Sequence, residues 1–277
     1  MADAATFLGR DELLLPFRRG FRWAWARRGL DLTVRMARTS ALVVAPHPDD
    51  ETLGCGVSIL RKRDAGRPVH IAMVSDGAAA PRSGISPAEL AAIRREEARQ
   101  AGGRLGVDAE QLHFLDFPDG GVCDQVDEVS ARLAELLEAC QPEQMLIPVS
   151  CEGHPDHNAS GAAARRAAAM TGYTGQVLEY GVWLWTHWPW TRGYGTEGWS
   201  PRRVFGDPVD RVREVRPLLV DARGYRERQL AALAEHVSQT TPDEAGNAPT
   251  LPASLLAAST RSPVEIYLEV GALDHLA

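Results

Sequence analysis

Two short segments of the chain combine histidines and carboxylates in a way that suits metal binding. Residues 47–51 (HPDDE) follow the apolar run 41–45, and residues 154–157 (HPDH) follow the largely apolar segment 143–150. The three carboxylates of the first segment repel one another, and a carboxylate removed from water is costly without a partner. A bound dication would neutralise them. A catalytic zinc site typically has three His, Asp or Glu ligands and keeps one position open.

The two segments together could supply the ligands of one ion. His47 and Asp50 are three residues apart at an expected strand-to-helix turn, and the segment 154–157 would add a third ligand from another loop. A purely structural explanation is the alternative, because an Asp pair after a strand is often only a helix cap. Single histidines elsewhere are expected to be structural: His70, His113, His187, His236 and His275. Two such segments at the ends of strands favour the metal site.

Two rival explanations of the same residues are weaker. Gly54-Cys55-Gly56 resembles part of a dinucleotide-binding fingerprint, but the third glycine is missing and the preceding carboxylates would repel a pyrophosphate. Cys151 with the histidines of segment 154–157 could form a thiolate-containing zinc site. That arrangement would leave His47 and Asp50 without a purpose, so we expect Cys151 to be structural.

The composition is that of an ordinary globular protein. The chain has 277 residues, 44% of them hydrophobic and 24% charged, and its net charge of −7 disfavours a nucleic-acid binder that relies on overall charge. Its four cysteines form no C-x-x-C pair, which is typical of reduced thiols. No segment approaches the roughly 20 apolar residues of a membrane span, and no secretion signal is recognised. We expect a cytoplasmic protein; its oligomeric state is not indicated.

Strand and helix patterns alternate from residue 41 onward, which predicts an α/β fold. We expect a Rossmann-like, mostly parallel sheet with helices on both faces. Ligands in such sheets bind beyond the carboxyl ends of the strands, where both histidine segments would lie. The expected strands are 41–47, 68–77, 111–117, 143–150 and 175–185, and the expected helices are 51–66, 86–107, 124–141 and 158–171.

The two ends of the chain depart from this alternation. Residues 16–37 alternate arginines with aromatic residues, which predicts an amphipathic helix packed across the sheet; an interfacial helix that touches a membrane is the alternative. After Trp185 we expect a Trp-rich loop, two short strands within 202–221, a helix at 225–240 and a strand at 265–270. We therefore predict one domain, 1–277. It comprises an N-terminal helical extension (1–39), an α/β core (about 40–185) and a C-terminal β/α elaboration (about 186–277).

The two histidine segments also identify a family. APHPDDE at 45–51 together with HPDH at 154–157 resembles the LmbE-like, or PIG-L-like, zinc-dependent N-deacetylases. The likeness runs from about residue 40 to about 241, and shorter matches support it: SDG at 75–77, RREEA at 94–98, PDG at 118–120 and AEHVSQ at 234–239. The resemblance implies a hydrolase that removes an N-acetyl group from N-acetylglucosaminyl conjugates. Zinc would be its metal, although these ligands also accept ferrous iron.

The resemblance also implies a role for each site residue. The zinc ligands would be His47, Asp50 and His157. Asp49 would be the general base that takes a proton from the attacking water and passes it to the leaving amine. His154, as an imidazolium, would stabilise the oxyanion, and Asp156 would orient His154 and favour its charged form. Glu51 would act as a cap, support the site or contact substrate.

Further residues are candidates for substrate contact. The resemblance suggests Arg94, which it pairs with Glu97, and Asp76 is a plausible partner for a sugar hydroxyl; a solvated helix face and a loop turn are the structural alternatives. Trp188 and Trp190 would form an apolar lip suited to a bulky aglycone.

The expected partner is a small-molecule glycoconjugate. An amidase acting on a thiol-sugar conjugate, a non-catalytic carbohydrate-binding protein and a nucleotide-dependent enzyme are the alternatives.

Overall fold

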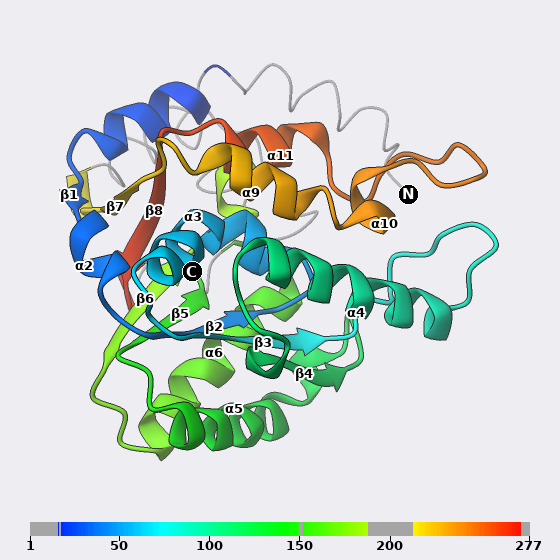
Figure 1. Ribbon diagram of the computed structural model, residues 1–277, viewed down its shortest axis with the longest axis horizontal. Helices are drawn as coiled ribbons and strands as arrows, with labels where there is room; N and C mark the ends of the chain where they lie inside the picture. Colours follow the sequence, from blue (N-terminus) through cyan, green and yellow to red (C-terminus); the bar gives the residue numbers. More distant parts are fainter. Residues whose placement is uncertain (1–15, 17, 150–151, 188–212, 273–277) are drawn as a thin grey trace.

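The computed structural model describes residues 16, 18–149, 152–187 and 213–272 (Figure 1). Their strands form one eight-stranded sheet in the order β1-β7-β8-β6-β5-β2-β3-β4. The strands are β1 (Leu30–Asp31), β2 (Ala41–Ala45), β3 (Val69–Ser75), β4 (Leu112–Phe117), β5 (Gln144–Pro148), β6 (Gln176–Tyr180), β7 (Leu218–Asp221) and β8 (Val264–Glu269). Neighbouring strands from β6 to β4 are parallel, whereas β8 is antiparallel to both β6 and β7. The predicted α/β fold is confirmed.

Helices cover both faces of this sheet (Figure 1). On one face, α3 and α4 pack against Val43, Ile71 and Met73; on the other, α5 and α6 pack against Leu42 and Val44. These alternating residues of β2 and β3 are all buried because both faces of a parallel sheet are covered. Residues 18–26 are helical. The helices after them are α2 (Thr33–Ala37), α3 (Asp50–Asp64), α4 (Pro87–Arg104), α5 (Val126–Cys140), α6 (Pro155–Met170), α7 (Leu184–His187), α9 (Arg226–Leu233), α10 (Val237–Thr240) and α11 (Ala253–Thr260).

Several expected boundaries are wrong. The strand expected at 175–185 ends at Tyr180, where Gly181 leads into α7, so Trp183 and Trp185 do not fill one face of a strand. The helix expected at 225–240 is divided into α9 and α10 by a turn. The helix expected at 16–37 is interrupted near residue 29, where β1 joins the sheet beside β7. Helix α11 was not predicted.

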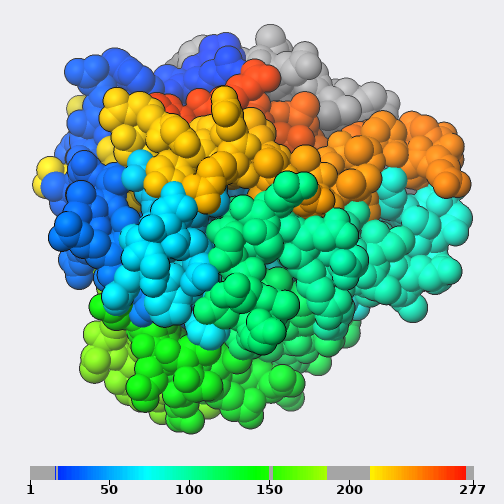
Figure 2. All heavy atoms as spheres, viewed as in Figure 1, coloured from blue at the N-terminus to red at the C-terminus, as the bar shows by residue number. Residues whose placement is uncertain are grey.

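The C-terminal elaboration packs directly on the α/β core. Figure 2 shows residues of α9 and the segment that follows it, gold to orange, against α4 in green. The side chain of Arg104 on α4 forms an ion pair with Glu235 after α9, with 2.7 Å between nitrogen and oxygen. Within the described ranges, no helix is both long enough and apolar enough to cross a bilayer.

Candidate metal centre

The first histidine segment turns sharply between β2 and α3. His47 lies in the loop after β2, and α3 begins at Asp50. Asp49 precedes the helix with a φ of 137°, a conformation that residues with a side chain rarely adopt. Its carboxylate makes no capping hydrogen bond to the helix, so the helix-cap explanation does not hold for this residue.

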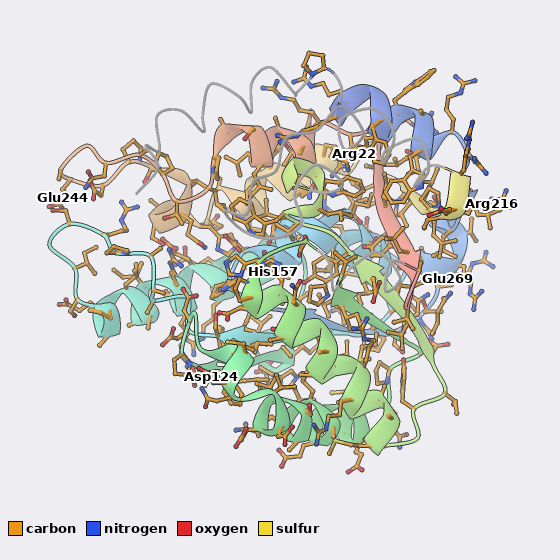
Figure 3. All side chains as sticks on the ribbon, turned by 180° about the vertical axis from the view of Figure 1, so that it is seen from behind. Arg22, Asp124, His157, Arg216, Glu244 and Glu269 are labelled. Carbon is orange, nitrogen blue, oxygen red and sulfur yellow. The ribbon has the colours of Figure 1, made fainter. Side chains whose placement is uncertain are left out.

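The second histidine segment opens α6. His154 immediately precedes the helix, and Asp156 and His157 belong to its first turn (Figure 3). The helix begins three residues before the expected start, because Pro155 suits the first position of a helix. As a result the His157 side chain is held by regular backbone and is completely buried.

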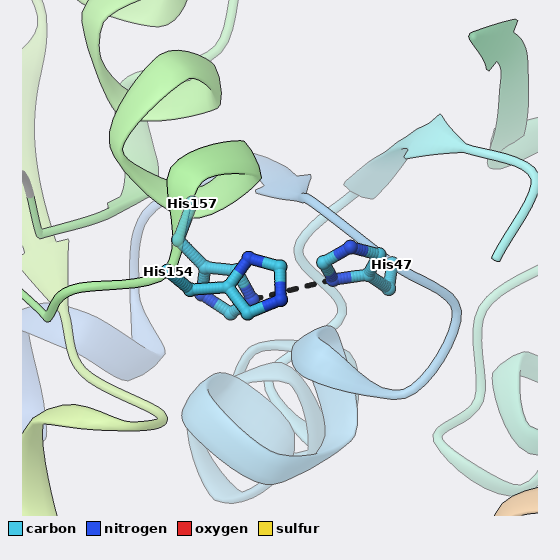
Figure 4. Close-up of side chains that lie close together, drawn as sticks. All are labelled: His47, His154 and His157. Carbon is cyan, nitrogen blue, oxygen red and sulfur yellow. Dashed lines mark hydrogen bonds between the residues drawn. The ribbon is translucent and has the colours of Figure 1, made fainter. Parts of the chain in front are cut away.

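Side chains from the two segments meet beyond the carboxyl ends of β2 and β5. His47 Nδ1 and His157 Nε2 lie 3.2 Å apart, as the dashed line in Figure 4 marks. Asp50 Oδ2 is also 3.2 Å from each of these nitrogens. One donor atom from each of the three residues therefore occupies a corner of a nearly equilateral triangle.

This triangle has the dimensions of one face of a tetrahedral metal site. Metal–ligand bonds of roughly 2.0–2.2 Å place tetrahedral ligand atoms about 3.3–3.6 Å apart. The observed 3.2 Å edges need only a small expansion to admit an ion. Two imidazole nitrogens and a carboxylate also form a donor set typical of catalytic zinc. The expected ligand residues thus fit a divalent metal, and the structure brings all three together.

A carboxylate that the sequence analysis did not single out holds His157 in place. Glu152 Oε1 lies 2.5 Å from His157 Nδ1, so the proton on that nitrogen leaves Nε2 free to bind a metal. The other oxygen of Glu152 accepts hydrogen bonds of 2.7 and 2.9 Å from the backbone N–H groups of Val182 and Leu184. Glu152 is fully buried, and its two backbone partners lie between the end of β6 and the first residue of α7. It therefore fixes the imidazole from behind.

Two further carboxylates face the opposite side of the His47 ring. His47 Nε2 lies 3.2 Å from Asp119 and 3.4 Å from Asp156, and Asp156 also accepts a 2.7 Å hydrogen bond from the Gly120 backbone. Asp156 thus contacts His47 in this structure, and its expected role in orienting His154 stays a prediction. Both carboxylates keep a proton on Nε2 and so leave Nδ1 available to a metal.

Without a cation, imidazole protons balance the carboxylates. Burial lowers the pKa of His157, but Asp50 and Glu152 outweigh it and raise that pKa to about 9. Burial acts in the same way on His47, whose contacts with carboxylates raise its pKa well above the usual value. Burial opposes ionisation of Asp50, yet His157 and His47 hold its pKa below the usual range. A dication can replace the two imidazole protons at a similar total charge.

Asp49 lies beside this cluster with its carboxylate free. Among the described residues it has no hydrogen-bond partner, although the side chain is buried. Burial and the adjacent Asp50 charge raise the pKa of Asp49 to about 8, and His236 opposes them. Glu51 Oε2 accepts a 3.0 Å hydrogen bond from the Asp49 backbone, and its other oxygen lies 3.4 Å from His236. Glu51 and His236 thus support the unusual backbone of Asp49 from behind.

His154 lies close to the triangle but outside it. Its ring centroid is 5.0 Å from that of His47 and 4.8 Å from that of His157. Trp183 stacks beside the His154 ring with 6.4 Å between centroids, so this tryptophan borders the site. Burial, then His157 and His47, lower the pKa of His154 to about 4. Without a cation, these surroundings favour the neutral ring. The imidazolium stays a prediction.

Of the candidate substrate residues, the structure describes Arg94 and Asp76. Arg94 is 2% exposed and donates to the Gly77 carbonyl, while its Nε and Nη2 are buried and lack a partner among the described residues. The explanation of Arg94 as part of a solvated face is therefore wrong. Asp76 Oδ1 accepts hydrogen bonds from the backbones of Ala78 and Asp119, as a turn residue does, and Asp76 also lines a cavity of about 370 Å³. Trp188 and Trp190 lie outside the described residues.

The supporting residues missed by the sequence analysis left only partial signals. PDG at 118–120 is one of the supporting family matches, but nothing in it indicated that Asp119 contacts a ligand histidine. Glu152 follows a strand and precedes HPDH, a position that could have suggested it. His236, expected to be only structural, is buried behind the site because the turn between α9 and α10 directs it inward.

Comparisons with known proteins agree with this arrangement. Residues 42–168 match the family model described as PIG-L: GlcNAc-PI de-N-acetylase. A diacetylchitobiose deacetylase of Thermococcus kodakarensis is 33% identical over 135 residues, which cover 47% of this chain and 49% of the relative. A probable N-acetyl-alpha-D-glucosaminyl L-malate deacetylase 2 of Bacillus cereus is 31% identical over 134 residues, covering 46% of this chain and 60% of the relative. The alignments thus span about half of each of these two relatives.

A solved structure shares the fold over nearly the whole chain. The N,N'-diacetylchitobiose deacetylase from Pyrococcus horikoshii superposes with a TM-score of 0.60 at 20% identity. The superposition covers 99% of this chain and 97% of that one. The family match contains both histidine segments and the strands that position them. The segment 42–168 thus matches the PIG-L family model, and the whole chain shares its fold with a solved deacetylase structure.

Proposed function

We propose that the protein is a metal-dependent hydrolase that removes the N-acetyl group from an N-acetylglucosaminyl conjugate. The observation that carries this proposal is the triangle of donor atoms beside a buried, unpartnered carboxylate. The triangle comprises His47, Asp50 and His157, with 3.2 Å edges, and the carboxylate is Asp49. The match of residues 42–168 to the PIG-L: GlcNAc-PI de-N-acetylase model supports the same reaction, and both relatives described above are named as deacetylases.

The three ligands would hold the ion and leave a position open to water and substrate. Zinc is the first candidate, and ferrous iron accepts the same donors. When bound there, a divalent ion supplies a Lewis acid that activates water at neutral pH and polarises the acetamide carbonyl. Glu152 and Asp119 orient the two imidazoles through their outer nitrogens.

Asp49 is the proposed general base. Its carboxylate takes a proton from the attacking water and then donates it to the nitrogen of the leaving amine as the C–N bond breaks. Such a group needs to be close to the reacting atoms without being consumed by other contacts, and the Asp49 carboxylate has no competing hydrogen bond in the described structure. Glu51 keeps the Asp49 backbone in its rare conformation, which holds the carboxylate beside the ligands.

His154 is proposed to bind the substrate's carbonyl oxygen. A neutral imidazole can still donate one N–H to the oxygen that becomes negative in the transition state, so the reaction does not require the imidazolium. Trp183 beside it would restrict the motion of the ring and cover one side of the acetamide. Asp156 contacts the outer nitrogen of His47 and would help to orient that ligand.

The cavity bordered by Asp76 and Asp119 is the proposed sugar site. Asp119 links it to the candidate metal centre, since the same side chain lies 3.2 Å from His47. Buried Arg94, with two nitrogens lacking a partner in the described structure, could donate to a sugar hydroxyl or to the carbonyl. The remaining walls are mostly apolar: Pro81, Ile85, Leu90 and Pro118. These walls suit the ring faces of a sugar.

Acetate release tests this function. The protein would be stripped with a chelator, reloaded with Zn²⁺ or Fe²⁺, and assayed on N-acetylglucosamine, diacetylchitobiose and larger N-acetylglucosaminyl conjugates. We expect acetate release to disappear with the metal and to return on reloading. Undiminished activity of metal-free protein would contradict the proposal. Cleavage of a different amide, with the acetamide intact, would favour an amidase.

A bulky aglycone remains a separate proposal that concerns Trp188 and Trp190. Replacing both by Ala should lower kcat/KM for large apolar conjugates more than for N-acetylglucosamine. Equal effects on large and small substrates would remove the support for an apolar lip. Trp23→Ala, at an exposed tryptophan of the N-terminal segment, is the matched control.

A further inference from the structure

A second group of metal-ligating side chains lies at the opposite edge of the sheet. His70 is the second residue of β3, His113 the second residue of β4, and Cys140 the last residue of α5. One nitrogen of each histidine and the Cys140 sulfur all lie within 4.8 Å of one another. The candidate metal centre follows the carboxyl ends of the strands, whereas this group is at their amino ends.

Strand register and helix packing explain why the three residues converge. His113 pairs with Ala72 across the β3–β4 ladder, and His70 precedes Ala72 by two residues, so both imidazoles emerge on the same face. Helix α5 covers that face through Leu133 and Leu137, which places Cys140, one turn later, at the same end. Rigid elements therefore present all three side chains, and none of them lies on a loop.

The two imidazoles are close enough to share an ion. His70 Nδ1 and His113 Nε2 are 3.1 Å apart, near the separation of neighbouring ligands in a tetrahedral site. In the structure the two nitrogens face each other as an N–H donor and an acceptor. Burial, aided by Arg63 for His70 and by His70 for His113, lowers the pKa of both rings, which favours the neutral form that binds a metal. The Arg63 guanidinium is itself engaged by Asp108 at 3.1 Å.

We propose that His70, His113 and Cys140 form a second metal site for a thiophilic divalent ion such as Zn²⁺. The ion would replace the imidazole–imidazole hydrogen bond. Each ring turns about its Cβ–Cγ bond to direct a lone pair at the ion, the proton between the rings moves to an outer ring nitrogen, and the Cys140 thiol releases its proton to solvent. One proton is thus released per ion bound, and a water completes the coordination. The ion would tie β3, β4 and α5 together and take no part in hydrolysis.

Cobalt binding tests the proposal, because a thiolate bound to Co²⁺ gives a near-ultraviolet charge-transfer band that His and Asp ligands do not. Wild type would be titrated with Co²⁺ beside Cys140→Ser and His113→Ala. Cys123→Ser, at an exposed cysteine elsewhere on the chain, is the matched control. Melting followed by circular dichroism would establish that each variant is folded.

We expect the band in wild type and in Cys123→Ser, at one thiolate-bound Co²⁺ per chain, and its loss in folded Cys140→Ser and His113→Ala. We also expect it to persist in His47→Ala, which removes a ligand of the other centre. Zinc should abolish the band by competition and should raise the Tm of wild type more than that of Cys140→Ser. Absence of the band in cobalt-saturated wild type, or its persistence in Cys140→Ser, would overturn the proposal.

Discussion

At the scale of single residues, two of the three crowded carboxylates after β2 have partners of their own, and the third has none in the described structure. Asp50 contacts two imidazoles, Glu51 accepts from the Asp49 backbone and lies beside His236, and Asp49 itself stays unpartnered in the described structure. Of the three acidic residues, only Asp49 has a strained backbone, with a φ of 137°, and its carboxylate is the one without a partner in the described structure. Its burial near like charge and its lack of a structural partner are why we propose Asp49 as the reactive carboxylate.

The contact between Glu152 and His157 predicts a loss of metal affinity in Glu152→Gln. The amide would direct an N–H at the proton on His157 Nδ1, so the imidazole would turn or change tautomer. Loss of such an outer partner typically weakens metal binding by about 10–100-fold. Calorimetric titration with Zn²⁺ measures the affinity of each protein for the metal. Glu143→Gln, at an exposed carboxylate, should bind metal like wild type; equal affinities in all three proteins would contradict this role of Glu152.

Lys62 predicts a pH dependence of folding stability. Burial lowers the pKa of its ammonium from 10.5 to about 7. This happens although the ammonium donates hydrogen bonds to four oxygen atoms, which belong to Met36, Thr39 and Gln144. Between these two values the unfolded chain binds more protons than the folded chain, so the stability contribution of Lys62 rises with pH. In urea unfolding, the free energy of unfolding of wild type relative to that of Lys62→Met should therefore be larger at pH about 9.5 than at pH about 7. If the difference in free energy of unfolding between the two proteins did not change with pH, the lowered pKa of Lys62 would be contradicted.

At the scale of elements, α3 is the helix on which the candidate metal centre depends. It is buried along most of its length between the sheet and the C-terminal helices, and its glycines allow this close packing. A Cβ at Gly54 would lie 2.2 Å from the Tyr180 ring, whose hydroxyl is fixed by a 2.7 Å hydrogen bond to the Val44 carbonyl. The ring cannot retreat without breaking that bond.

Two Gly→Ala substitutions should therefore have opposite effects. Gly54→Ala should destabilise the protein by about 1–3 kcal/mol or more through overpacking. Gly103 lies on the exposed face of α4, and no atom is within 4 Å of a Cβ added there. Gly103→Ala should therefore stabilise the protein by about 0.5–1 kcal/mol, because alanine favours the helix. Denaturant unfolding measures both. A stable Gly54→Ala protein would show that α3 can move away from β6.

The sequence predicted which helices and strands form more accurately than it predicted their first and last residues. Apolar runs with clear helical periodicity located β2, β3, β5 and the helices between them, and so placed both histidine segments at one edge. The boundaries failed where single residues decide them: Pro155 starts α6 early, and Gly181 ends β6 early. Glu152 and His236 could not be assigned, because their partners are far away in the sequence and only the folded chain brings them together.

At the scale of the whole molecule, the C-terminal elaboration completes both the sheet and the site. Strand β8 pairs with β6 on one side and β7 on the other. After α9, the Ser238 backbone donates to Glu97 of α4 at 2.7 Å, and the Gln239 amide donates to the Pro48 carbonyl in the turn that carries the candidate metal ligands. The order of these strands could not be predicted from the sequence, since the antiparallel insertion of β8 leaves no local pattern.

These contacts predict that the family-matching segment is not sufficient by itself. A chain that ends at residue 187 would expose the edge of β6 and remove the hydrogen bond to Pro48. We expect it to unfold without a cooperative transition and to lose high-affinity metal binding. Circular dichroism melting and zinc titration measure the two effects. Cooperative unfolding with wild-type affinity would instead show that the elaboration is a separate unit, contrary to the single domain that we propose.

The central claim is that a metal held by His47, Asp50 and His157 works together with Asp49 as general base. The most direct test compares acetate release and metal content in wild type and Asp49→Asn. The asparagine keeps the shape of the side chain but cannot accept the proton. We predict metal content equal to wild type and acetate release lower by about 10²–10⁴-fold. Full activity of a metal-loaded Asp49→Asn protein would contradict the account.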